Sequence, residues 1–245
     1  MRSAIPARAR AATIVCDQMR TAAILPVKSF SLAKTRLGGS VAETLRARLA
    51  RAMVADVLLA LSETGAIAHT IVVTREDSVA GAARRQGAIV VDDAAEGGQS
   101  AAVGLGVQRA LAEGIERVLC IPGDCPALDP AELEALLAGA EGEPGVVVVP
   151  DRHGTGTNGL LLTPPDAIAP SFGPGSCEHH LALALAAGVS CRLEQPPSLL
   201  LDIDTGADLA ALRRRLAGGG GRASRTRAVL GERERTDLPS VTSTG

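Results

Sequence analysis

One apolar stretch that stops at an aspartate decides the fold of this chain: Val118-Leu119-Cys120-Ile121-Pro122-Gly123-Asp124-Cys125-Pro126. The aliphatic run is typical of a buried strand, and the glycine and prolines around Asp124 end that strand. A strand that ends in this way presents a carboxylate at the carboxyl edge of a parallel sheet, where ligands bind in open α/β folds. The stretch therefore predicts a buried strand over 117–121 with a functional aspartate at its tip.

Strands and helices alternate on both sides of this stretch. Short apolar runs predict strands, and apolar residues that recur every four positions predict amphipathic helices. Because unbroken apolar strands are covered on both faces, the alternation indicates an α/β fold with a mainly parallel sheet. The predicted strands cover 22–27, 70–73, 88–91, 117–121, 146–149, 159–162 and 190–193, and the predicted helices cover 45–61, 79–86, 100–111, 130–137, 178–187 and 205–216.

The alternating pattern occupies residues 21–217 and indicates a single domain between two extensions. Residues 1–20 show no clear periodicity, which predicts a disordered extension or a translation start at Met19. Residues 218–245 begin with a run of glycines and continue as a polar, charged segment. This composition predicts a disordered tail.

Composition argues against several classes of function. The chain has two Phe, no Tyr and no Trp, which disfavours the base stacking used to bind single-stranded nucleic acid. The predicted domain is acidic, which disfavours duplex binding. No apolar run approaches the roughly 20 residues of a membrane span, and the N-terminus lacks the apolar region of a secretion signal. The five cysteines are scattered and lack zinc-ligand spacing. Taken together, these features predict a cytoplasmic protein without nucleic-acid or membrane partners.

A second acidic segment, Leu200-Leu201-Asp202-Ile203-Asp204-Thr205, repeats the design of the Asp124 strand near the end of the domain. If this segment is a strand, Asp202 and Asp204 point to one face. Asp124 is predicted to bind Mg²⁺ rather than only to form a turn, and Asp202 is the second predicted ligand. For Asp204, metal binding and capping of the last helix remain equally open, since Asp208 stands where a capping box needs it.

Three cations follow the first strand: Lys28, Lys34 and Arg36. Such a cluster suits a triphosphate, whereas a single surface cation would indicate only solubility. The segment has neither GxxxxGK[ST] nor GxGxxG, so P-loop and dinucleotide-binding functions have no support.

Three further loops are candidates for substrate contacts. Gly97, Gly98, Gln99 and Ser100 open a helix, where Gln99 or Ser100 either binds a base or acts as an ordinary cap. The loop 154–159 and the segment 172–176 are rich in small and hydroxyl residues, and Ser176 stands before a helix, where phosphate or carboxylate binds well. Two adjacent histidines, His179 and His180, diverge on a helix and cannot share one zinc ion, although one of them could contact an anion.

Together these motifs resemble the guanylyltransferase family of coenzyme F420 biosynthesis, which joins GTP to 2-phospho-L-lactate or phosphoenolpyruvate. The resemblance spans residues 22–216 and rests on motifs that occur in one order: Pro26-Val27-Lys28, Ala33-Lys34-Thr35-Arg36-Leu37, Gly123-Asp124-Cys125-Pro126-Ala127-Leu128, Asp151-Arg152-His153-Gly154-Thr155-Gly156-Thr157-Asn158, Phe172-Gly173-Pro174-Gly175-Ser176 and Asp202-Ile203-Asp204-Thr205. The aspartate motifs are shared with many nucleotidyltransferases, including those of molybdenum-cofactor assembly.

The resemblance implies a single Rossmann-like, GT-A-like nucleotidyltransferase domain with a mixed sheet, Mg²⁺ as cofactor and pyrophosphate as by-product. It implies that Asp124 and Asp202 hold the metal, with Asp204 as the further candidate left open above, and that Lys28, Lys34 and Arg36 bind the triphosphate. Thr155, Gly173 and Ser176 would then grip the acceptor. Base recognition would fall to Gly97, Gly98, Gln99 and Ser100, although the chain has Gln99-Ser100 where we expect an Asn-bearing helix start.

The sequence leaves several questions open. It does not choose between phosphoenolpyruvate and 2-phospho-L-lactate, which differ only in saturation at the carbon bearing the phosphate. The alternatives are another nucleotidyltransferase of this fold, acting on a cofactor precursor such as molybdopterin, and a nucleotide-binding protein without turnover. A homodimer and a hand-off of product to the next enzyme of the pathway are also open.

Overall fold

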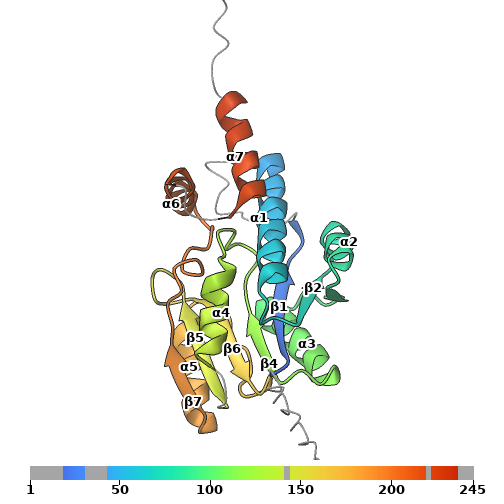
Figure 1. Cartoon of the computed structure of the whole chain (residues 1–245), viewed down its shortest axis with the longest axis vertical. Coiled ribbons are helices and arrows are strands. Elements are labelled where there is room, and N and C mark those ends of the chain that lie inside the picture. Colours follow the sequence, from blue (N-terminus) through green and yellow to red (C-terminus); the bar gives the residue numbers. More distant parts are fainter. Residues whose placement is uncertain (1–18, 31–42, 141–143, 219–221, 237–245) are drawn as a thin grey trace, which may run out of the picture.

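The computed structural model describes residues 19–30, 43–140, 144–218 and 222–236. Within these residues the chain forms an α/β domain in which a central sheet is covered by helices (Figure 1). The strands are β1 (Thr21–Val27), β2 (His69–Thr74), β3 (Ile89–Val91), β4 (Arg117–Cys120), β5 (Gly145–Pro150), β6 (Thr157–Thr163) and β7 (Ser190–Leu193). The helices are α1 (Glu43–Glu63), α2 (Asp77–Arg85), α3 (Gln99–Ala112), α4 (Pro130–Ala138), α5 (Ser176–Ala187), α6 (Gly206–Ala217) and α7 (Ser224–Thr236).

The sheet has the strand order β3-β2-β1-β4-β6-β5-β7. The pairs β1/β2, β2/β3, β1/β4 and β5/β7 are parallel, whereas β6 runs antiparallel to both β4 and β5. A short connection, residues 151–156, joins β5 to β6, and a connection this short allows only an antiparallel neighbour. The prediction of a mainly parallel mixed sheet is therefore confirmed.

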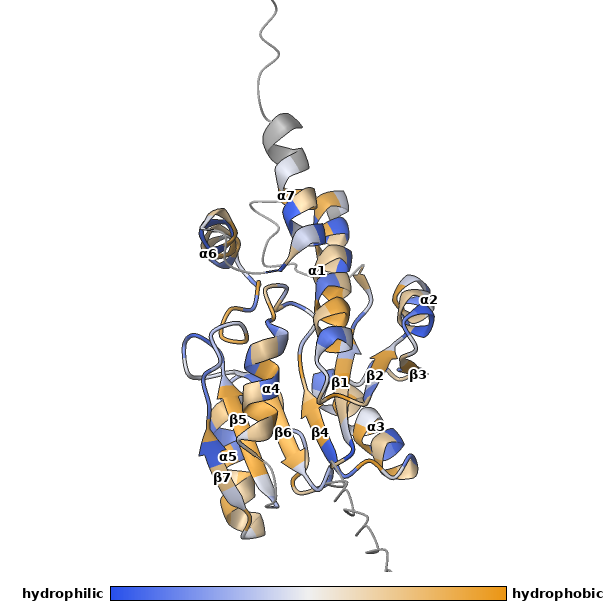
Figure 2. Ribbon diagram, viewed as in Figure 1, coloured by the Kyte–Doolittle hydropathy of each residue, from blue (hydrophilic) through white to orange (hydrophobic). Residues whose placement is uncertain are grey.

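Alternate residues of each strand pack on opposite faces of the sheet, as the pleat requires. In β1, Leu25 contributes to a core beneath α1, α2, α4, α6 and α7, whereas Ile24 contributes to a core beneath α3 and α5. Figure 2 shows the strands as the most hydrophobic part of the chain, with polar residues on the outer helix faces. The strands β1, β4, β5 and β6 are thus covered on both sides, which explains their largely apolar sequences, whereas the edge strand β7 is mostly exposed.

The predicted tail from residue 218 onward is wrong for residues 224–236, which form α7 beside α1 (Figure 1). Ala223 and Leu230 are buried against the core. The buried carboxylate of Asp56 on α1 accepts hydrogen bonds from the backbone N–H groups of Arg225 (3.2 Å) and Thr226 (2.8 Å) and so caps the first turn. The polar composition of this segment predicted disorder because it gives no indication of these few long-range contacts. The predicted extension at 1–18 and the end of the tail at 237–245 lie outside the described residues.

The acidic segment 201–204 is not a strand, contrary to the prediction. It forms no ladder with the sheet, and one backbone hydrogen bond, from Ile203 N to Asp124 O (3.1 Å), joins it to the loop after β4. Among the described residues, no helix is long and apolar enough to cross a membrane.

Candidate active site

A cavity of about 640 Å³ opens at the edge of the sheet where β1 and β4 end. It collects side chains from the loops after β1, β3, β4 and β5, from α1 and α3, and from the start of α5. The predicted site residues that line this cavity are Lys28, Gln99, Asp124, Thr155, Gly173, Ser176, Asp202 and Asp204. Lys34 and Arg36 lie outside the described residues.

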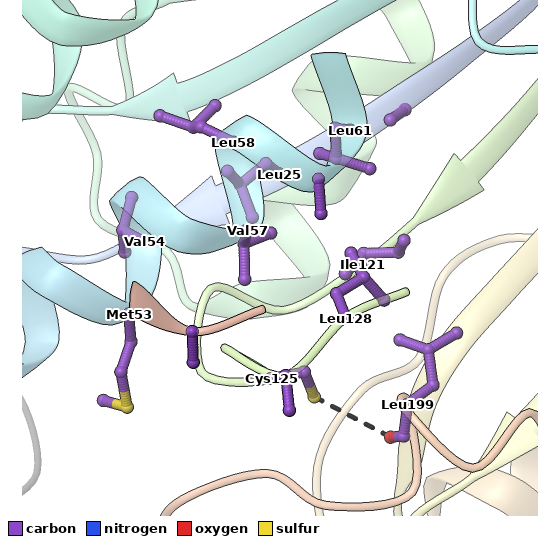
Figure 3. Packing of buried hydrophobic residues seen from close by; sticks show 14 of the residues in the cluster. Leu25, Met53, Val54, Val57, Leu58, Leu61, Ile121, Cys125, Leu128 and Leu199 are labelled. Atoms are coloured by element: carbon purple, nitrogen blue, oxygen red, sulfur yellow. Dashed lines mark hydrogen bonds between the residues drawn. The ribbon is translucent and has the colours of Figure 1, made fainter. Parts of the chain in front are cut away.

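Asp124 enters the cavity from a loop that passes close to α1. At Gly123, a Cβ atom would lie 2.9 Å from Cγ2 of Val54, so the loop approaches the helix more closely than a side chain would allow without a shift. Beneath the loop, Cys125 is fully buried and its Sγ lies 3.7 Å from the carbonyl oxygen of Leu199 (Figure 3). These contacts and the Ile203–Asp124 backbone bond place the two acidic segments side by side.

Asp202 is half-buried and is oriented by Asn158. The Asn158 Nδ2 group donates to Asp202 Oδ1 (3.1 Å) and to the carbonyl oxygen of Leu199 (2.8 Å). Burial raises the pKa of Asp202, and the negative charges of Asp124 and Asp204 raise it further, against the opposing hydrogen bond from Asn158. The carboxylates therefore repel one another, and a bound cation would relieve this repulsion.

Asp204 does not cap the last helix. The cap of α6 is Thr205, whose side chain accepts from Asp208 N, while Asp208 Oδ2 accepts from Thr205 N (2.7 Å). Asp204 contributes its backbone N–H, which donates to Asp208 Oδ2 (3.2 Å), and it lines the cavity. Among the described residues, no three His, Cys, Asp or Glu side chains are already assembled as a metal site. Asp124, Asp202 and Asp204 therefore line one cavity, but their side chains are not already arranged as a complete set of metal ligands.

The residues at the start of α3 that were predicted to recognise the base do not all have the same position relative to the cavity. Gly98 caps the helix with a positive φ of 94°. Gln99 lines the cavity, whereas Gly97, Gly98 and Ser100 are not among its lining residues. Ser100 Oγ instead accepts from Phe172 N (2.8 Å) and lies 3.4 Å from Phe172 O. Ser100 therefore braces the segment before α5, and of this group only Gln99 faces the ligand space.

Thr155, Gly173 and Ser176, which the resemblance predicts to bind the acceptor, line the same cavity, and we call the loops that carry them the acceptor side after that prediction (residues 151–158 and 171–176). Asp151 Oδ1 accepts from the backbone N–H groups of His153 and Thr155 (both 3.0 Å) and shapes the turn between β5 and β6. Cys177 N donates to Thr155 O (3.1 Å), which ties this turn to the start of α5. Gly173 has a φ of 134°, a conformation that favours glycine.

His180 supports the acceptor side, and because its two ring nitrogens face other protein groups, the predicted anion contact falls to the exposed His179 if either histidine makes it. Its side chain is fully buried, Nε2 accepts from Ser171 N (2.9 Å), and Nδ1 lies 3.1 Å from Thr157 Oγ1. Burial, and then the neighbouring His179, lower the pKa of His180 to about 4. The ring is therefore neutral near pH 7, with its proton on Nδ1.

Asp93 is a lining residue that sequence analysis missed. It follows β3 as Asp124 follows β4, so the strand-end position that identified Asp124 was also present here. Lys28, after β1, is exposed and faces the same cavity. The cavity thus combines an acidic centre (Asp124, Asp202 and Asp204), the cation of Lys28 and loops that carry hydroxyl groups. This arrangement is suited to phosphate-containing substrates and divalent cations.

Comparison with known structures supports this fold. A nucleotidyl transferase from Methanothermobacter thermautotroptrophicus has a TM-score of 0.61 at 22% identity and covers 82% of this chain and 99% of its own. The 4-diphosphocytidyl-2C-methyl-D-erythritol synthase of Anaerococcus prevotii has a TM-score of 0.58 at 13% identity and covers 82% of this chain and 97% of its own. The predicted nucleotidyltransferase fold is confirmed.

Sequence comparison is more specific. The phosphoenolpyruvate guanylyltransferase of Conexibacter woesei is 48% identical over 220 residues, which are 89% of this chain and 99% of that protein. The protein of the same name from Rubrobacter xylanophilus is 40% identical over 195 residues, which are 79% of this chain and 94% of that protein. A family model described as guanylyl transferase CofC like matches residues 21–227, and this chain therefore belongs to that family.

Proposed function

We propose that this protein transfers the GMP unit of GTP to phosphoenolpyruvate and releases pyrophosphate. The observation that carries the proposal is the backbone hydrogen bond from Ile203 to Asp124, which holds the acidic segment 201–204 beside the loop after β4. The cavity that these two segments line also contains Lys28 and Ser176. Family membership and the names of the relatives support the choice of GTP and phosphoenolpyruvate. They favour neither a molybdopterin-type substrate nor a protein without turnover.

In the proposed reaction, a phosphate oxygen of the acceptor attacks the α-phosphorus of GTP. The new phosphorus–oxygen bond forms in line with the bond to the β-phosphate, which breaks and leaves its electron pair on pyrophosphate. The acceptor phosphate is already ionised, so the step needs neither a general base nor a covalent protein intermediate. Catalysis then depends on positioning the two substrates and on stabilising negative charge.

The chain's own residues divide these tasks by position. Lys28 binds the triphosphate, together with Lys34 and Arg36 from the segment outside the described residues. Thr155, Gly173 and Ser176 hold the acceptor, on a surface whose backbone N–H groups already donate hydrogen bonds to Asp151, Ser100 and His180. Because these braces form within the protein, they do not have to be formed when the acceptor binds.

Asp124, Asp202 and Asp204 are the residues that would hold Mg²⁺. Burial and, after it, the negative charges of Asp124 and Asp204 raise the pKa of Asp202, and this fits the assignment because a bound cation offsets the repulsion. When bound, Mg²⁺ supplies positive charge beside the reacting phosphates. Asn158 orients Asp202 through its hydrogen bond of 3.1 Å and keeps the carboxylate directed into the cavity.

The proposal is tested by measuring pyrophosphate release with each nucleoside triphosphate paired with phosphoenolpyruvate or 2-phospho-L-lactate. We expect release with GTP and phosphoenolpyruvate, and a loss of about 100-fold or more in Asp124→Asn. Asp166→Asn, at an exposed position outside the cavity, is the matched control and should keep full activity. Near-full activity in Asp124→Asn would remove Asp124 from the reaction, and preference for another pair of substrates would replace the proposed one.

A further inference from the structure

Asp93 is a buried carboxylate with one oxygen atom, Oδ1, that has no hydrogen-bond partner in the described part of the chain. Its side chain is 5% exposed and lines the cavity from the loop after β3. Oδ1 is buried and has no hydrogen-bond partner among the described residues. A buried acceptor without a donor is costly, and native proteins rarely keep one without a purpose. A ligand that fills the cavity is a source of such a donor.

The chemistry of Asp93 limits which part of a ligand can lie beside it. A carboxylate repels the phosphates of GTP and both anionic groups of phosphoenolpyruvate, and none of these carries an N–H donor. The partner within GTP is therefore a neutral group with hydrogen-bond donors, on the base or on the ribose, and a pair of adjacent donors matches a carboxylate best. Guanine is the standard base that presents two adjacent donors on one edge, N1–H and the N2 amino group, and a carboxylate has two oxygens to accept them. Adenine, cytosine and uracil each present an acceptor on the corresponding edge.

The position of Asp93 in the sheet agrees with this assignment. The strand order places the end of β3 two strands from β1, which carries Lys28, and three from β4, which carries Asp124. Three strand spacings correspond to about 14 Å, which leaves room for a nucleoside between the base-reading group and the reacting phosphate. The acceptor side lies beyond β4, where β5 ends and β6 begins. The cavity therefore runs from Asp93 through Lys28 and Asp124 to Thr155.

We propose that Asp93 determines guanine specificity by accepting hydrogen bonds from N1–H and N2–H of the base, with the amide of Gln99, which lines the same cavity, donating to O6. This inference rests on the proposed function and deepens it. It also gives a reason for an acidic group at one end of a cavity whose substrates are otherwise anionic. Sequence analysis had placed base recognition at 97–100, and of those residues only Gln99 faces the cavity.

The test exploits xanthine, which retains N1–H but has a carbonyl oxygen in place of the N2 amino group. In Asp93→Asn, the side-chain oxygen can accept from N1–H while the amide nitrogen donates to that carbonyl. Binding of GTP and XTP is measured by calorimetry on the full chain with Mg²⁺. We expect Asp93→Asn to bind GTP at least about tenfold more weakly than wild type and to prefer XTP. Asp92→Asn, the exposed neighbour outside the cavity, should retain the wild-type preference.

An unchanged preference for GTP over XTP in a folded Asp93→Asn protein would overturn the inference. Should this variant fail to fold, the test uses the wild-type protein with ITP, which lacks the N2 amino group of GTP. The wild type should bind ITP at least about tenfold more weakly than GTP, and equal binding of the two would overturn the inference. Pyrophosphate release from wild type keeps the two proposals apart. Turnover of GTP and phosphoenolpyruvate without discrimination against ITP removes only the role of Asp93, whereas no turnover of GTP with any acceptor removes the proposed function.

Discussion

The acceptor side and the acidic centre of the cavity satisfy their polar groups in opposite ways. On the acceptor side, Asp151, Ser100 and His180 each bond to backbone groups of the loops that they support. In the acidic centre, Asp202 has one oriented hydrogen bond, from Asn158, but faces the charges of Asp124 and Asp204. The first region is organised before any ligand arrives, whereas the second gains its compensating charge from what binds there.

This difference separates two contributions to activity. A braced loop lowers the entropic cost of binding a small, charged acceptor, because its backbone is already in place. A group of repelling carboxylates instead lowers the stability of the free protein and strengthens the binding of a cation. Substitutions that remove a carboxylate from the acidic centre should therefore lower activity without lowering the stability of the free protein. Substitutions on the acceptor side should lower both stability and activity, or should lower the affinity for the substrate.

The largest effect is expected for Asp202→Asn. Pyrophosphate release should fall by about 100-fold or more, because one of the charges that offset Mg²⁺ is lost. The melting temperature of the free protein should stay level or rise, since the raised pKa of Asp202 shows that the folded state disfavours its charge. Asp166→Asn again serves as the control. A marked drop in melting temperature together with retained activity would reverse the comparison between the two regions.

A smaller effect is expected from the titration of His180. Its pKa in the folded protein, about 4, lies below the ordinary value of 6.5, so the unfolded chain takes up the proton first as the pH falls. The free energy of unfolding should therefore decrease from about pH 6.5 to about pH 4, by roughly 3 kcal/mol for this group alone. The raised pKa of Asp202 acts in the opposite direction, because its protonation at low pH relieves repulsion.

Chemical denaturation at a series of pH values separates the contribution of His180. His180→Gln should be less stable at pH 6.5, yet its loss of stability between pH 6.5 and 4 should be smaller than that of wild type. His69→Gln, at an exposed position at the start of β2, should retain the wild-type pH dependence. If the two variants show the same pH dependence, a buried neutral His180 does not support the acceptor side.

The smallest effect is expected for Ser100→Ala, which removes the hydrogen bond to Phe172 N. The KM for phosphoenolpyruvate should rise by up to about tenfold while the KM for GTP changes little, because the brace acts on the acceptor side. Steady-state kinetics with each substrate varied in turn give the two values. Ser62→Ala, which removes an exposed hydroxyl on α1, is the control. Equal changes in both KM values would show that Ser100 does not act on the acceptor side alone.

The local pattern of the chain was sufficient to predict most of the fold. Apolar runs identified the buried strands of the sheet because such strands have no polar face, whereas the edge strand β7 is mostly exposed; Asp129-Pro130 correctly marked the start of α4. Asp124 was found because glycine and proline end its strand. The segment 201–204 was mistaken for a strand because it alternates like one, although no neighbouring strand is there to pair with it. Helix α7 was missed because its packing depends on Asp56, far away in the sequence.

By itself, the sequence determined the α/β alternation, the acidic strand tip at Asp124 and the small-residue loops, because each follows from residues that are neighbours along the chain. Only the tertiary structure decided that Ser100 and His180 act as braces, that Thr205 rather than Asp204 caps α6, and that Asp93 faces the ligand space. Side-chain roles of this kind depend on which hydrogen-bond partners and which water-excluded surfaces the fold brings together. The partner of Ser100, for example, lies 72 residues away, beyond the reach of any local pattern.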